Sequence, residues 1–266
     1  MAVNIIFKNR EAQRKESLVK EINDLMSISC DQLYVFFAAV DASNRPNFEN
    51  VYNKNFGLEG FYQNRKVEGK LPTNYPREID EEIQSRSLRM NQCEHFIWIS
   101  KRICEAEDIH FAWVYSHELQ HLRQSLKNPY LLIVANLLKY VKYEIAAIDI
   151  PTEFECEGKA KQIVVRIFGE EKCISYLNKM RAGSRSNEVR YSRLLQLNIL
   201  PKYDVEGEIQ QAICANIKTI KEIRKQRQNS ASTNWNIDID KLCTCKNPHD
   251  AIMSSVTRMS HNDDTH

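Results

Sequence analysis

The pentapeptide His117-Glu118-Leu119-Gln120-His121 lies inside a stretch with strong helical periodicity and constrains how the chain can fold. Asp108 is suited to begin a helix that continues to about residue 126, and Asn128-Pro129 ends it. Residues 117 and 121 are one helical turn apart, so their imidazoles rise from the same face. The chain therefore needs a packed helix that carries two histidines on one side.

Most of the remaining chain also has the spacing of helices. Two short apolar runs, 33–40 and 95–99, are typical of buried strands. Seven Gly and seven Pro are too few for a chain of many short strands and turns. The segment 42–77 holds three of each and is predicted to be irregular. We therefore predict a mainly helical α+β fold with a small β-sheet. The helical ranges are 11–29, 79–91, 108–126, 131–148, 151–168, 170–181, 187–198 and 205–228.

The overall composition indicates one globular domain. Of 266 residues, 42% are hydrophobic, and the net charge of +2 gives no general attraction to nucleic acid or to an anionic membrane. We place a single folded domain at 1–228, with its core at about 93–200, and a polar C-terminal tail at 229–266. No apolar run approaches the ~20 residues of a membrane span. Without a secretory signal, eight scattered cysteines favour reduced thiols and a cytoplasmic protein.

Two imidazoles one helical turn apart can bind the same zinc ion, at ~2.0–2.1 Å from each nitrogen. Glu118 is about 100° around the helix from His117, which aims it poorly as a ligand but leaves it near enough to accept a proton from a water. A catalytic zinc needs a third protein ligand, and the next histidine after His121 is His249. The helix predicted at 151–168 offers carboxylates instead: Glu153, Glu155 and Glu157.

Helical geometry separates these three carboxylates. The apolar stripe of the helix includes Cys156 and Ala160, and Glu153 extends that stripe toward the N-terminus. Glu157 borders the same face one turn later, whereas Glu155 falls on the solvent side. We predict Glu153 as the third ligand and Glu157 as a partner that holds a ligand imidazole. Glu157 as the ligand remains the alternative.

The HExxH pentapeptide followed by Glu153, Cys156 and Glu157 resembles the gluzincin class of zinc metallopeptidases. Among bacterial members the chain resembles Lit-type phage-exclusion peptidases and, more distantly, ImmA/IrrE-like peptidases that cut repressors. The resemblance covers about residues 108–168. It departs from the usual pattern at Cys156, where Ala is typical, and at Glu157, where Asp or Asn is typical.

The resemblance implies a zincin-like fold with an active-site helix and intracellular cleavage of one or a few protein targets. Zn²⁺ is then held by His117, His121 and Glu153, and Glu118 is the general base for a metal-activated water that attacks a peptide bond. An activating peptide or protein is a further partner to consider. The strand at 95–99 is a candidate sheet edge for an extended substrate. Four residues are candidates to support a ligand or to stabilise the transition state: Glu157, His110, Tyr140 and Tyr143.

Two other functions fit the sequence. In a zinc-binding sensor or regulatory protein the metal is structural and nothing is cut. In a nucleic-acid-binding regulator the basic helix face at 218–227 contacts RNA or DNA, although this face lacks the aromatics that stack on single strands. Cys243, Cys245 and His249 are candidates for a small zinc site, but the C-x-C pair lacks an evident fourth ligand, and free thiols are the preferred interpretation.

Overall fold

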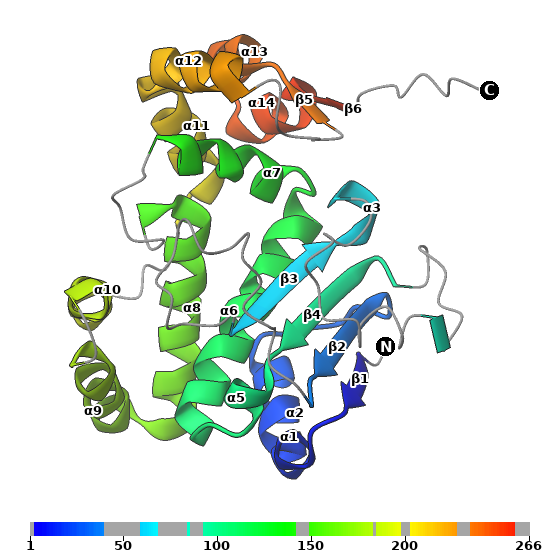
Figure 1. The fold of residues 1–266 in the computed structure, drawn as a ribbon, viewed down its shortest axis with the longest axis vertical. Coiled ribbons are helices and arrows are strands. Elements are labelled where there is room, and N and C mark those ends of the chain that lie inside the picture. The colour runs from blue at the N-terminus through cyan, green and yellow to red at the C-terminus, as the bar shows by residue number, and fades with distance from the viewer. Residues whose placement is uncertain are drawn as a thin grey trace.

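The computed structural model is mostly helical, with a four-stranded mixed sheet and a small two-stranded sheet (Figure 1). The predicted class, mainly α with a small β-sheet, is confirmed. None of the described helices has the length and apolar character needed to cross a membrane. The structure describes residues 3–39, 59–68, 84–85, 93–141, 149–182, 185–197, 203–227 and 235–258.

The main sheet has the strand order β1-β2-β4-β3, in which β1, β2 and β4 are parallel and β3 is antiparallel to β4. Strands β2 and β4 occupy the two predicted apolar runs. Because β4 pairs with β2 on one side and β3 on the other, the prediction that 95–99 is a sheet edge is wrong. All five residues of β4 are buried, as a central strand requires. The strands are β1 (Asn4–Phe7), β2 (Leu33–Phe37), β3 (Gly60–Asn64) and β4 (His95–Ile99).

Strand β3 lies within the segment 42–77, which the sequence predicted to be irregular. Gly and Asn have low strand propensity, so the strand depends on its tertiary contacts. Phe61 stacks on Trp98 on one face of the sheet. On the other face, the Asn64 amide donates a hydrogen bond of 3.0 Å to the Ser125 hydroxyl of the neighbouring helix. The parts of 42–77 beyond 59–68 lie outside the described residues.

Helix α6 is the central element, because it lies between the sheet and α8 (Figure 1). It spans Asp108–Lys127, and α8 spans Pro151–Phe168, both as predicted to within a residue. Gly169, which follows α8, has a φ of 87° that favours glycine. The first helices are α1 (Arg10–Arg14), α2 (Glu16–Leu25), α3 (Arg65–Glu68) and α5 (Lys101–Cys104).

The helix predicted at 131–148 is shorter than expected. Helix α7 ends at Ala135 and tightens into the 3-10 helix η2 (Asn136–Tyr140), as helix ends often do. Residues 142–148 lie outside the described part of the chain, as does most of the helix predicted at 79–91. Helices α9 and α10 pack against each other beside α8. These elements are α7 (Leu131–Ala135), α9 (Glu170–Arg181) and α10 (Arg185–Gln196).

The elements after residue 203 form a second apolar cluster with α7 and η2. The predicted tail at 229–266 is therefore wrong for residues 235–258, where Ile237, Leu242 and Ile252 are buried within an otherwise polar sequence. Asn216 divides the helix predicted at 205–228, and its amide donates to the Ala212 carbonyl. The elements are α11 (Val205–Ala215), α12 (Ile217–Arg227), β5 (Trp235–Ile237), α13 (Ile239–Thr244), α14 (Pro248–Ser255) and β6 (Val256–Arg258).

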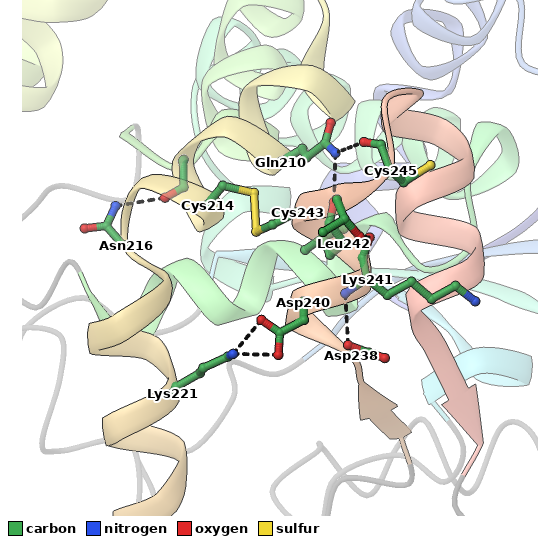
Figure 2. Close-up of a disulfide and its surroundings, with 12 residues drawn as sticks. Gln210, Cys214, Asn216, Lys221, Asp238, Asp240, Lys241, Leu242, Cys243 and Cys245 are labelled. Atoms are coloured by element: carbon green, nitrogen blue, oxygen red, sulfur yellow. Dashed lines mark hydrogen bonds and ion pairs between the residues drawn. A yellow bond between two sulfur atoms is a disulfide. The ribbon is translucent and has the colours of Figure 1, made fainter.

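A disulfide joins Cys214 of α11 to Cys243 of α13, with their Cα atoms 5.5 Å apart (Figure 2). The prediction of free thiols is wrong for this pair. The two cysteines are 29 residues apart in sequence and meet only because their helices pack together, which no local pattern indicates. The Cys245 sulfur points away from the disulfide (Figure 2). His249 contacts Glu206, so the predicted alternative of a zinc site with Cys243 and Cys245 is not formed. The other six cysteines form no disulfide, and a cytoplasmic location stays a prediction.

Glu206 connects the second apolar cluster to the end of α6. Its side chain is buried, and Oε1 accepts hydrogen bonds from the Asn128 amide at 2.7 Å and from His249 Nδ1 at 2.9 Å. Oε2 forms an ion pair with Lys127 Nζ at 2.8 Å. Burial alone would raise the pKa of Glu206, but hydrogen bonds from Lys127, Asn128 and His249 hold it below its usual value.

Replacing Glu206 by Ala removes the acceptor that Lys127 and Asn128 share. We expect the free energy of unfolding to fall by about 1–3 kcal/mol, measured by urea denaturation, because the buried Asn128 amide loses its acceptor. Glu208→Ala is a matched control in the first turn of the same helix, where the side chain is exposed. It should cost less than about 0.5 kcal/mol. Equal losses in the two variants would contradict this role of Glu206.

Candidate metal centre

Helix α6 presents His117 and His121 on the side that packs against α8. The two imidazole rings meet edge to face with their centroids 4.9 Å apart. His121 is buried and the His117 side chain is 14% exposed, so the pair lies at the boundary of the core rather than on an open surface. The prediction that one helical face carries both rings is confirmed.

Glu153, in the first turn of α8, brings one carboxylate oxygen to both histidines. Its Oε2 lies 3.2 Å from Nε2 of His117 and 3.6 Å from Nε2 of His121. Helix α8 begins at Pro151, which suits the first turn because proline lacks the N–H that has no partner there. The structure therefore brings together the three residues predicted as ligands. Their binding of a metal stays a prediction.

Cys156 approaches His121 from the opposite side of its ring. The Cys156 Sγ is 3.3 Å from His121 Nδ1, and Gln124 Oε1 is 2.9 Å from the same nitrogen. Potential ligand atoms of His117, His121 and Cys156 all lie within 4.8 Å of one another, so this cluster could hold a metal ion. The sequence reasoning placed Cys156 only in the apolar stripe, although its position three residues after Glu153 was a usable signal.

Glu153 and Cys156 are thus both available as the third ligand, but they contact different ring nitrogens. The Glu153 oxygen faces Nε2 of both histidines, whereas the sulfur contacts Nδ1 of one. A metal between the two Nε2 atoms has Glu153 beside it, while Cys156 stands behind His121. Burial raises the pKa of the Cys156 thiol to about 12, which favours the protonated form over the thiolate that binds metals. We therefore favour Glu153 as the third ligand.

Glu157, which the sequence predicted as a partner of a ligand imidazole, lies near His117. Its side chain is buried, and Oε1 is 4.0 Å from His117 Nδ1. Oε2 accepts a hydrogen bond of 2.6 Å from the Trp113 indole, and Oε1 also forms an ion pair with Arg190 of α10. Sequence reasoning proposed neither Trp113 nor Arg190 for the site, and nothing local in the sequence connects α10 to it.

The side chain of Glu118, on α6, packs against Gly60, the first residue of β3. A Cβ atom on Gly60 would lie 3.2 Å from both Cγ and Oε1 of Glu118 and 3.1 Å from Ile99 Cδ1. A side chain at position 60 would therefore press on the glutamate, which would have to shift by a few tenths of an ångström. Burial is the main reason why the pKa of Glu118 is raised, and the nearby carboxylate of Glu153 adds to it.

The remaining predicted residues lie elsewhere or beyond what the structure describes. His110 Nδ1 is 2.7 Å from the Tyr176 hydroxyl, and Nε2 is 3.5 Å from Glu59 Oε1, so its ring supports the segment that leads into β3. Glu155 accepts a hydrogen bond of 2.8 Å from the Gln124 amide, so it is half-buried rather than on the solvent side as predicted. The side chain of Tyr140 and all of Tyr143 lie outside the described residues.

The three predicted ligand residues form an ion-paired cluster. Burial alone would raise the pKa of Glu153, but His121 and His117 hold it well below its usual range. Burial alone would lower the pKa of both imidazoles, but Glu153 raises it in each, together with Glu157 at His117 and Cys156 at His121. Protons on the imidazoles therefore occupy the place that a metal ion would take.

Comparisons of the chain with protein-family models, with curated proteins and with solved structures gave no match. The resemblance to Lit-type and ImmA/IrrE-like peptidases therefore depends on the motif residues alone. The zincin-like fold and the identity of the metal as zinc stay predictions.

Replacing the two possible third ligands separately tests the assignment. We expect Glu153→Ala to weaken zinc affinity by about 100-fold or more, because a residue bound directly to the metal contributes at least as much as one that only contacts a ligand. Cys156→Ser and the control Glu155→Ala should change it by less than about threefold, a shift of under 1 kcal/mol. Competition with a zinc-binding dye measures all three variants. Zinc retained by Glu153→Ala and lost by Cys156→Ser would reverse the assignment.

The pKa shifts also predict a pH dependence. Because the histidine pKa values are raised, their pairing with Glu153 stabilises the metal-free protein at acidic pH and is lost as the pH rises through those raised values. The Glu153 side of the pair is lost only when the pH falls through its lowered pKa. Zinc binds only neutral imidazoles, so its affinity for the site increases over the same rise in pH.

We therefore expect the increase in Tm on adding zinc to be larger at about pH 8.5 than at about pH 6, since protons compete less with the metal for the imidazoles as the pH rises. Differential scanning fluorimetry with and without chelator measures it. The variant in which both histidines are replaced by Ala is the control and should show no zinc effect. An equal increase at both pH values would contradict exchange of protons for metal.

Proposed function

We propose that the chain is a zinc-dependent endopeptidase with the metal bound by His117, His121 and Glu153. The observation that carries this proposal is the convergence of the Glu153 oxygen on both Nε2 atoms, next to the buried carboxylate of Glu118. Two imidazoles and one carboxylate are the donor set of catalytic zinc sites in which one position stays open. Zinc bound there supplies a Lewis acid that lowers the pKa of water and polarises a carbonyl.

Glu118 is suited to move the proton in such a reaction. Its raised pKa, caused mainly by burial, makes it a better proton acceptor than an exposed glutamate. Gly60 and α6 leave its side chain little room, so the carboxylate stays beside the histidines. Glu118 accepts a proton from the attacking water and delivers it to the leaving amine. The resemblance to Lit-type peptidases favours a specific protein substrate over general digestion.

A structural zinc site in a sensor or regulatory protein is the second candidate. One observation favours it, because Cys156 lies close enough to His121 to be counted with the possible ligands. Structural zinc sites are closed by four side chains and leave no position for water. The proposed nucleic-acid face at 218–227 has less support, since Lys221 pairs with Asp240 and Arg224 donates to the Ile237 carbonyl (Figure 2 shows the first contact).

Glu118→Gln separates an enzyme from a structural site. We expect zinc affinity to stay unchanged, because Glu118 is not a ligand, and proteolysis to fall by about 100-fold or more, because the proton acceptor is lost. Mass spectrometry of new protein N-termini, in cells that produce each variant, measures the cleavage. Glu171→Gln, at an exposed position of α9, is the control and should cleave like the wild type. Full biological effect in Glu118→Gln with zinc bound would favour the structural site.

A further inference from the structure

We propose that Arg190 of α10 is a positioning residue of the metal centre, because it fixes the Glu157 carboxylate whose Oε1 faces His117. This inference depends on the proposed zinc site and extends it to a helix that carries none of the ligands. Arg190 acts through Glu157 and makes no contact with the metal itself.

The first step is the burial of Glu157. Only 2% of this residue is exposed, and it lies one helical turn from Glu153 on α8. A buried carboxylate is costly unless a cation and hydrogen bonds compensate its charge. The Arg190 guanidinium provides the cation at Oε1, and the Trp113 indole provides a hydrogen bond at Oε2.

The second step is that the two oxygens of Glu157 are held by donors from two different helices. Trp113 comes from α6 and holds one oxygen, while Arg190 comes from α10 and holds the other. Two donors from different helices fix the plane of the carboxylate as well as its position. The oxygen that Arg190 holds, Oε1, is the one 4.0 Å from His117 Nδ1. A shift of the guanidinium would therefore move this oxygen and change its distance to the imidazole.

The third step is the effect on His117. A carboxylate near Nδ1 favours a proton on that nitrogen, so that the ring, once it has lost its Nε2 proton, offers the Nε2 lone pair to the metal. Outer contacts of this kind contribute about 10- to 100-fold to metal affinity or activity. Arg190 therefore supports metal binding at a distance, by way of Glu157.

Arg190 also influences the opposite wall of the site. Burial alone would raise the pKa of Glu59, but His110, Arg190 and Arg102 hold it below its usual value. Glu59 directly precedes Gly60, the residue against which Glu118 packs. Arg190 thus pairs with Glu157 on α8 and also favours the ionised form of Glu59, directly before β3.

A double-mutant cycle tests this inference with Co²⁺ as the probe. We expect Arg190→Gln and Glu157→Gln each to weaken Co²⁺ affinity by about 10- to 100-fold and to change the visible Co²⁺ spectrum in the same way. If Arg190 acts through Glu157, the double variant should bind no more weakly than Glu157→Gln alone. Arg193→Gln is the matched control, because Arg193 lies on the same helix and pairs with Asp149 away from the ligands. It should leave affinity and spectrum unchanged.

Arg190→Lys keeps the positive charge but loses the planar fork, so it should recover only part of the affinity. It also carries the test if Arg190→Gln does not fold, since affinity equal to wild type in Arg190→Lys would overturn the role of the fork. Additive losses in the double variant, or full affinity in Arg190→Gln, would overturn the inference while leaving the zinc site intact. If the wild type binds neither Co²⁺ nor Zn²⁺, the proposed zinc site fails, and the role of Arg190 fails with it.

Discussion

The burial of charged side chains between α6 and α8 is the constraint on which the rest of the structure depends. Two imidazoles and the carboxylates of Glu153 and Glu157 lie there, largely removed from water. Such groups are tolerated only when each has a partner of opposite charge or a hydrogen bond. Glu153 is paired with both histidines, and Glu157 with Trp113 and Arg190. The site therefore needs contributions from α10 as well as from the two central helices.

The fold supplies the rigidity that this arrangement requires. On its other side α6 packs against the sheet, where Phe37 of β2 contacts the rings of Phe111 and Tyr115. At its C-terminal end, Lys127 and Asn128 are bound by the buried Glu206 of α11. Helix α6 is thus fixed along its length by an apolar face and at one end by a polar contact. The histidines between them have little freedom to separate.

Sequence reasoning succeeded where the information was local. Helical periodicity located α6 and α8, and the spacing within each helix placed His117, His121 and Glu153 on facing sides. It failed where residues far apart in sequence meet. The contact between Gly60 and Glu118 and the pairing of Arg190 with Glu157 depend on tertiary packing that no local pattern encodes. The same limit applies to the disulfide and to the ordered C-terminal elements, whose buried residues are sparse within a polar sequence.

Whether Cys156 binds in addition to Glu153 decides between an open and a closed metal site, because two imidazoles and one carboxylate leave a position for water and a fourth side chain fills it. X-ray absorption at the zinc edge tests it most directly, since zinc–sulfur bonds are ~2.3 Å long and zinc–nitrogen or zinc–oxygen bonds ~2.0–2.2 Å. We predict a first shell of nitrogen and oxygen only for the zinc-loaded protein. A sulfur at the longer distance would contradict the account and identify Cys156 as a ligand.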